Sequence, residues 1–273
     1  MTDLILVHLA GEDGSEEVHG YWIDFWDYSQ CISRSGHTPQ IPQALYHELN
    51  MIFDLSKYDF RLLEVESELY ALEDHLKLIE SQLEQSQRKE RLRLDTRIRT
   101  QRLSPEDPEW HEAIQHYDER IEFLFPRFFR GPFLVALYAV YESAVTEIAQ
   151  IMQKKSLQGI SIKDLRGDFL KRAKKYYKHI LNFDLYTEEK AWQRISMLAE
   201  LRNAFAHVNG RMEMLNENSR TKIKGWENQK TGIATYSGYI VCDAKIVEEI
   251  FQNVRESLEN LMNRYKNWDD IHA

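Results

Sequence analysis

The sequence predicts a mainly α fold: a helical bundle with a long heptad helix and a small β element near each end. Three observations indicate this fold class. The chain of 273 residues has only 11 glycines and 6 prolines, too few for a loop-rich all-β protein. Neither residue type occurs between residues 43 and 103. Several later segments carry apolar residues at helical spacing behind residues that favour helix starts.

Three regions are expected along the chain: residues 1–40, 41–125 and 126–273. Residues 1–40 are acidic and rich in aromatic residues, and no lysine or arginine precedes Arg34. Within this region Leu4–Leu9 and Tyr21–Tyr28 are candidate strands, joined by a glycine-containing turn.

The second region contains apolar residues whose spacing alternates between three and four. These residues are Leu55, Tyr58, Leu62, Val65, Leu69, Leu72, Leu76, Ile79 and Leu83. This heptad pattern predicts a long helix that pairs with another helix or folds back onto the body of the protein.

Charge is unevenly distributed along this predicted helix. Residues 42–87 hold three basic and ten acidic residues, a net charge of −7. Residues 88–102 hold seven basic and two acidic residues, a net charge of +5. The basic end is interpreted either as the solvated end of a coiled coil or as a nucleic-acid contact through Arg88, Arg91 and Arg93.

The third region is expected to be a helical domain. A helix from about residue 106 to 125 should be interrupted at Pro126, and a second helix should follow Gly131-Pro132. The sequence from Phe133 to Ala149 is apolar almost all round, which predicts a central buried helix.

A second basic segment follows in residues 163–178, behind a capping-box pattern in residues 161–164. Its net charge is +5, from seven basic and two acidic residues. The candidate RNA-binding residues in it are Lys171, Arg172, Lys174 and Lys175, which precede Tyr176 and Tyr177. Basic residues beside aromatic rings suit RNA, where cations meet phosphates and bases stack on rings. A plain solvated face is the alternative.

Thr187 should cap the next helix, which runs to about Val208 and stops before Gly210. Residues 216–241 are read as a β-hairpin or a long ordered loop. Asp243 should cap a last amphipathic helix that ends near residue 268.

The helix that ends near Val208 carries the residues that suggest chemistry. On a helical wheel, Arg202 falls on an expected core-facing stripe, while Asn203 and His207 share a second face. The stripe comprises Trp192, Ile195, Leu198, Ala199, Phe205 and Ala206. A histidine can move protons near neutral pH, and an arginine offers a permanent cation with a fork for phosphate oxygens. Cleavage of RNA at its own 2′-hydroxyl requires both.

A structural role is the alternative for these residues. Arg202 could pair with Glu142 or Glu147 on the buried helix. His207 could stabilise the C-terminal end of its own helix.

The sequence Arg202-Asn203-Ala-Phe-Ala-His207 resembles the signature of the HEPN superfamily. In that signature an arginine is usually followed by a polar residue, and a histidine comes after a gap of four to six residues. Here the polar residue is Asn203 and the gap is four residues. Tyr141-Glu142 resembles an aromatic–Glu pair in the first core helix of some HEPN families, which assigns Glu142 a supporting role. The resemblance covers residues 128–268.

The resemblance implies a helical bundle that works as a homodimer, with two motifs in one cleft. It further implies a metal-independent endoribonuclease that leaves a 2′,3′-cyclic phosphate and a 5′-hydroxyl, in a toxin–antitoxin pair or antiphage defence. Arg202, Asn203 and His207 would then be the catalytic residues, with RNA and an antitoxin or defence-system protein as partners. No cofactor and no metal are expected.

Two rival functions remain open at this point: a non-catalytic helical interaction protein and an RNA-binding regulator. A metal hydrolase is disfavoured because His111 and His116, spaced five apart, do not share a helix face. The net charge of −9 argues against binding of DNA by bulk charge. Two cysteines and the lack of a signal peptide or a membrane-length apolar run predict a cytoplasmic protein without membrane contact.

Overall fold

The computed structural model describes residues 3–10, 16–23 and 60–272, with side chains described for residues 62–269. The chain divides into two compact units, residues 1–58 and 59–273. In the first unit, strands β1 (Asp3–Ala10) and β2 (Glu16–Ile23) pair antiparallel. The predicted strand pair is therefore present, but its second strand lies nearer to the first in sequence than the predicted Tyr21–Tyr28.

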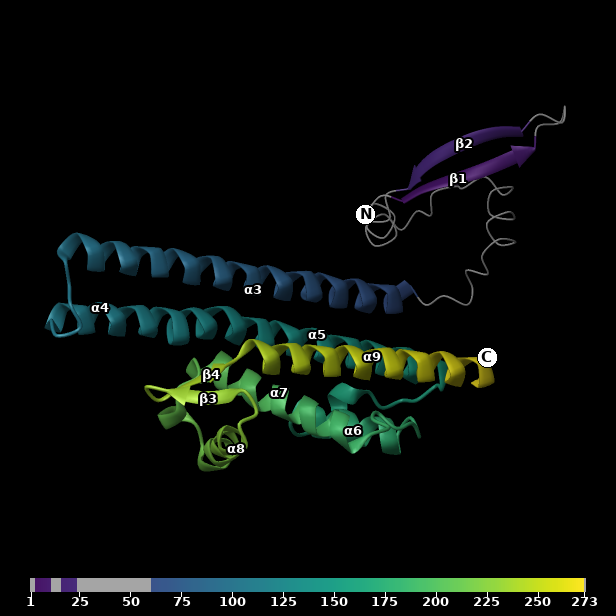
Figure 1. Ribbon diagram of the computed structural model, residues 1–273. Helices are drawn as coiled ribbons and strands as arrows, with labels where there is room; N and C mark the ends of the chain where they lie inside the picture. Colours follow the sequence, from purple (N-terminus) through teal and green to yellow (C-terminus); the bar gives the residue numbers. More distant parts are fainter. Residues whose placement is uncertain (1–2, 11–15, 24–59, 273) are drawn as a thin grey trace. The chain divides into compact units, whose positions relative to one another are not determined.

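The second unit is mainly helical. Its elements are α3 (Phe60–Gln101), α4 (Pro108–Asp118), the π-helical turn η2 (Glu119–Leu124), α5 (Phe125–Lys155), the 3₁₀ turn η3 (Ile162–Asp164), α6 (Phe169–His179), α7 (Glu189–Val208), the 3₁₀ turn η4 (Met212–Met214), α8 (Glu217–Asn228), β3 (Ile233–Tyr236), β4 (Tyr239–Cys242) and α9 (Ala244–His272). In Figure 1, α4 and α5 run back along α3, while α9 lies beside α5. The mainly α fold class with a small β element near each end is confirmed.

Helix α5 forms the centre of the second unit, as its apolar sequence predicts. It packs against α3, α6, α7 and α9. Leu134, Leu137 and Ile148 are fully buried, and Tyr177 of α6 donates a hydrogen bond to the Val145 carbonyl of α5 over 2.7 Å. Each of these four helices is therefore positioned by α5.

The predicted helix breaks at Pro126 and at Gly131-Pro132 are wrong, because η2 and α5 continue through both prolines. A proline removes one backbone hydrogen bond of a helix. Pro126 follows directly on the π-helical turn, where the α-helical bonding pattern is already altered. Pro132 is exposed, so the carbonyl that loses its donor lies on the solvent side, where water can satisfy it.

The heptad seam of α3 folds back onto the same chain, one of the two predicted outcomes. The seam residues from Leu62 to Leu83 are buried. They belong to the same hydrophobic core as α5 and α9, and His75 packs edge-on against Phe133 of α5. Leu55 and Tyr58 lie outside the described residues.

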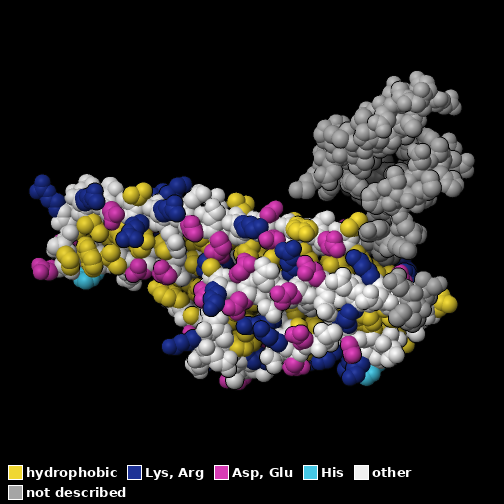
Figure 2. Space-filling model, turned by 45° about the vertical axis from the view of Figure 1, so that its right-hand side comes forward, with side chains coloured by type: hydrophobic (Ala, Val, Ile, Leu, Met, Phe, Trp, Pro, Cys, Tyr) yellow, Lys and Arg dark blue, Asp and Glu magenta, His cyan; other side chains and the backbone are white. Residues whose placement is uncertain are grey.

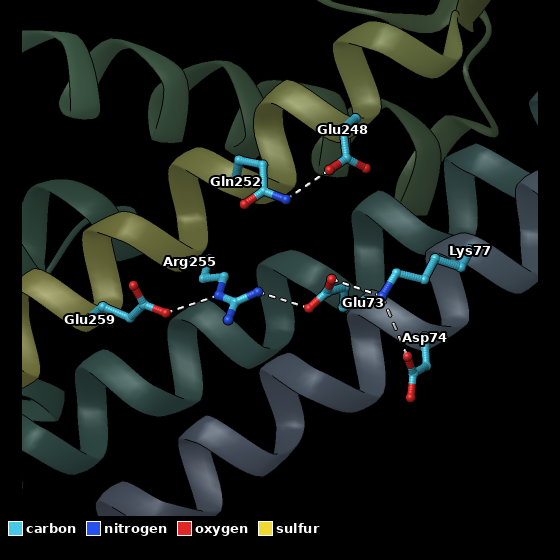
Figure 3. Close-up of polar contacts among 7 residues, drawn as sticks. All are labelled: Glu73, Asp74, Lys77, Glu248, Gln252, Arg255 and Glu259. Carbon is cyan, nitrogen blue, oxygen red and sulfur yellow. Dashed lines mark hydrogen bonds and ion pairs between the residues drawn. The ribbon is translucent and has the colours of Figure 1, made fainter.

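Polar contacts flank this seam (Figure 3). Arg255 of α9 bridges to Glu73 of α3 over 2.8 Å and to Glu259 of its own helix over 2.9 Å. Glu73 also bridges to Lys77 over 2.9 Å. Because these side chains remain partly exposed, their ion pairs contribute little to stability and mainly orient α3 on α9. The buried seam supplies most of the free energy that holds α3 against the rest of the unit.

Of three predicted helix starts, two differ from the structure in detail and one is confirmed. The Ser161–Asp164 capping box is present, but it caps η3, and α6 has its own cap in Asp168, which accepts from the Lys171 amide over 3.1 Å. Helix α7 starts after Glu188 rather than Thr187. The predicted cap Asp243 is confirmed, since its carboxylate accepts from the Ile246 amide over 2.8 Å.

The segment 216–241 is only partly the predicted hairpin. Its first half is helix α8, which Asn216 caps through the Ser219 amide. Strands β3 and β4 form the hairpin, with Ile233 opposite Cys242. Cys242 is a free, buried cysteine, and burial raises the pKa of its thiol to about 12.

The helical stretch Pro108–Lys155 is long and apolar enough, by length and composition, to cross a membrane, and it is the one such stretch among the described residues. Of its most apolar window, 44% is buried inside the structure. The core helix of a soluble protein has the same length and composition, so these two properties alone do not indicate a membrane span.

Gly131 allows α7 to approach α5 closely. A Cβ atom at this position would lie 2.9 Å from the Phe205 ring. We expect Gly131→Ala to lower the free energy of unfolding by about 1–2 kcal/mol, because overpacking at this contact outweighs the gain in helix propensity. Urea denaturation measures the change.

Gly225 in α8 is the matched control for this experiment. No atom lies within 4 Å of a Cβ built there, so Gly225→Ala should raise stability by up to about 1 kcal/mol. If both substitutions stabilise the protein, the close approach of α7 to α5 is not a feature of the fold in solution.

Candidate functional site

Helix α7 places the Arg202–His207 motif on its solvent-facing side. The face that packs into the core is formed by Ile195, Met197, Leu198, Leu201 and Ala204. The predicted stripe was therefore rotated: Leu201 and Ala204 are buried instead of Ala206, which is exposed. Arg202 is consequently half-buried at the margin of the core rather than inside it.

The three predicted catalytic residues meet within one chain. The Nη1 atom of Arg202 donates to Oδ1 of Asn203 over 3.0 Å and lies 3.3 Å from Nε2 of His207. On a helix Arg202 and His207 point in different directions. The long arginine side chain closes this gap by reaching across Asn203.

This contact assigns roles to the ring nitrogens of His207. A guanidinium group has donors only, so Nε2 must accept the hydrogen bond through its lone pair. The tautomer that can accept this bond carries its ring proton on Nδ1. In this contact the Nε2 lone pair is occupied by Arg202. It becomes free to take a proton when the guanidinium group turns to a phosphate, and a proton acceptor beside a permanent cation can then serve general-base catalysis there.

Tyr138 of α5 supports Arg202 from below. The guanidinium carbon of Arg202 lies 5.6 Å from the centre of the Tyr138 ring, a cation–π distance. Burial, together with the nearby Glu142 carboxylate, raises the pKa of Tyr138 well above its usual range. The ring therefore stays neutral beneath the cation.

No carboxylate among the described side chains forms a salt bridge with Arg202. The structural alternative in which Arg202 pairs with Glu142 or Glu147 is therefore not found. The charge of the Glu142 carboxylate contributes to the raised pKa of Tyr138, after burial of that ring.

The C-terminal end of α7 is held by a second arginine, which was not predicted from the sequence. Asn209 adopts a left-handed conformation and ends the helix, and its carbonyl accepts from Nη2 of Arg127 over 3.1 Å. Arg127 is 6% exposed, and its guanidinium group lies 4.2 Å from the centre of the Tyr239 ring. Burial lowers the pKa of Arg127, and the positive charge of Arg211 lowers it further. A basic residue between aromatic residues in an apolar helix was the signal available in the sequence.

Helix α8 borders the motif on its other side. Glu200, which precedes Asn203 by three residues, accepts hydrogen bonds from Ser219 and from Lys222, the latter over 2.7 Å. Glu200 therefore fixes α8 against α7. The motif lies between α5 and α8, open to solvent.

The basic end of α3 is partly neutralised. Arg88 pairs with Glu84 over 3.6 Å, and Arg93 pairs with Glu90 over 2.5 Å, while Arg91 is exposed. Figure 1 shows α3 on one side of α5 and α7 on the other. The structure therefore does not bring these candidate RNA-binding residues together with the motif.

The basic face of α6 is solvent-exposed, but its neighbouring aromatic rings are not. Lys171 pairs with Asp168 over 2.9 Å, and the ammonium group of Lys174 lies 4.3 Å from the centre of the Trp192 ring at the start of α7. Arg172 is half-buried and Lys175 is exposed. Tyr176 and Tyr177 are fully buried, so the interpretation that they stack RNA bases is wrong.

Charges of both signs are interspersed over much of the molecular face in Figure 2. In residues 62–269, no group of three or more His, Cys, Asp or Glu side chains is placed to hold a metal ion.

Comparison of the chain with protein-family models, with curated proteins and with solved structures finds no match.

Proposed function

We propose that the chain is a HEPN-type, metal-independent endoribonuclease. The observation that carries this proposal is the 3.3 Å contact between Arg202 and His207 on the open side of α7. It brings a proton acceptor and a phosphate-binding cation to one point, as the resemblance of the motif to HEPN ribonucleases requires. The proposed enzyme acts in the cytoplasm and needs no cofactor.

The proposed reaction starts at the RNA 2′-hydroxyl. When the Arg202 guanidinium group turns from His207 to the phosphate, the freed lone pair of Nε2 takes the hydroxyl proton while the 2′-oxygen forms a bond to phosphorus. The Arg202 guanidinium group stabilises the charge on the phosphoryl oxygens as the bond to the 5′-oxygen breaks. The products are a 2′,3′-cyclic phosphate and a 5′-hydroxyl. Asn203 holds the guanidinium group in position.

The 5′-oxygen needs a proton as it leaves, and His207 serves first as the base. We therefore propose a homodimer in which the partner supplies a second motif to the same cleft. The solvent-facing position of the motif leaves room for a second subunit.

As a toxin or antiphage-defence effector, the enzyme would be restrained by an antitoxin or defence-system protein.

The test is to incubate the purified full chain with total RNA in EDTA and to map the fragment ends. New 5′ ends should accept phosphate from polynucleotide kinase without prior dephosphorylation. New 3′ ends should resist ligation until the cyclic phosphate is removed. Intact RNA, or fragments with 5′-phosphates, would contradict the proposal, and RNA binding without cleavage would favour an RNA-binding regulator.

A further inference from the structure

A group of exposed aromatic rings is linked to the C-terminal end of α7, the helix that carries His207. Phe128 of α5 is 55% exposed, and its ring centre lies 4.8 Å from the guanidinium carbon of Arg127. The same guanidinium group binds the carbonyl of Asn209, two residues after His207. Phe128 is therefore anchored to the end of the motif helix.

Tyr236 at the tip of the β3–β4 hairpin is a second exposed ring in this group. It is 39% exposed and stacks on buried Phe123 with 5.1 Å between ring centres and 28° between ring planes. Phe123 in turn lies 5.4 Å from the Arg127 guanidinium carbon. Arg127 thus contacts Phe128 directly and is linked to Tyr236 through Phe123.

Positive charge accompanies these rings. The guanidinium carbons of Arg127 and Arg211 lie 4.2 Å and 5.6 Å from the centre of the same Tyr239 ring. Neither arginine forms a salt bridge with a carboxylate among the described side chains, whereas Arg93 of α3 and Arg255 of α9 do. Two cations held near one another without an anion favour an anionic ligand.

We propose that Phe128, Tyr236 and Arg211 form a subsite for single-stranded RNA next to the scissile phosphate. The exposed rings stack nucleobases, and Arg211 binds a backbone phosphate. Rings with open faces beside an unpaired guanidinium group are the chemistry by which single-stranded nucleic acid is bound without base pairing. This subsite rests on the proposed nuclease function, for which it supplies the substrate class.

The test measures binding apart from cleavage. His207→Ala protein is titrated in EDTA against a fluorescent single-stranded RNA of about 12 nucleotides, its duplex form and an abasic version of it. Phe128→Leu and Tyr236→Ala should each weaken single-strand binding by about 5- to 100-fold. Neither should change binding of the abasic strand. Arg211→Ala should reduce the slope of log affinity against log salt by about 0.7.

Matched controls come from the opposite parts of the unit. Tyr70 of α3 is 58% exposed and lies over Arg255, so Tyr70→Ala removes a similar ring over an arginine. Lys266→Ala removes an exposed cation near the far end of α9. Both variants should bind the single-stranded RNA as the parent does, and circular dichroism should be unchanged throughout.

Unchanged RNA affinity in the folded Phe128→Leu and Tyr236→Ala variants would overturn the subsite. The same holds if these variants lose self-association in sedimentation experiments while RNA binding persists, because the rings would then be a subunit interface. If the wild-type chain fails to cleave RNA but the ring variants still weaken binding, the nuclease proposal falls and the subsite stands.

Discussion

Replacement of Arg202 or His207 by alanine should reduce RNA cleavage by at least about 100-fold while leaving the fold intact. The alanine variant at 207 lacks the proton acceptor, and the variant at 202 lacks the cation that stabilises the phosphoryl oxygens. Both side chains lie at the margin of the core or outside it, so stability should change little. Initial rates of fragment formation, measured on one defined RNA in EDTA, give the effect.

The same helix and its neighbour offer controls. Arg194 lies on α7 and pairs with Glu249 of α9 over 3.1 Å, away from the motif. Arg194→Ala should retain cleavage, as should His179→Ala, which removes an exposed histidine from α6. Arg202→Lys retains the charge but not the planar, two-pronged guanidinium group that binds phosphate oxygens, so its activity should remain low. Full activity of a purified, folded His207→Ala variant would count decisively against the nuclease.

Two signals confined to a few residues predicted the structure correctly, although the cap predicted at Thr187 lies at Glu188. Asp243 caps α9 as predicted, and α7 ends at Val208 just before Gly210. Each of these depends on backbone groups within about four residues, so the sequence contains all the participants. The Ser161–Asp164 capping box also forms, but it opens only a single 3₁₀ turn, because the next helix has its own cap.

The effect of a proline could not be read locally. The loss at Pro132 depends on whether the freed carbonyl faces water, and that depends on how α5 is buried on its other sides. The contact of Arg127 with the end of the motif helix could not be predicted from the sequence for a related reason. Arg127 and Asn209 are 82 residues apart, and only the packing of α7 on α5 joins them.

The error at Tyr176 and Tyr177 was avoidable. The apolar positions of α6, Phe169, Leu170, Ala173, Tyr176 and Tyr177, follow helical spacing and all are buried. Adjacency to lysines in the sequence suggested an exposed ring, whereas periodicity places both rings on the core face. Exposure of an aromatic residue should therefore be judged from its helix face before RNA binding is inferred.

The heptad pattern of α3 predicted the helix but not its partner, and one substitution separates the two outcomes. Leu76 is 3% exposed in the seam against the same chain. We expect Leu76→Ala to lower the free energy of unfolding by about 2–5 kcal/mol, because it leaves a cavity in a close-packed core. Chemical denaturation followed by circular dichroism measures this loss.

Leu78 is the matched control, two residues away on the same helix and 58% exposed. Leu78→Ala removes the same atoms from the solvent side and should change stability by no more than about 0.5 kcal/mol. Equal small effects of both substitutions would mean that the seam is not buried in the folded chain.

A large effect of Leu76→Ala alone makes α3 part of the helical unit that holds α5, and α5 in turn positions Tyr138 beneath Arg202. Loss of this seam should then impair RNA cleavage as well as stability, although α3 lies on the other side of α5 from the motif.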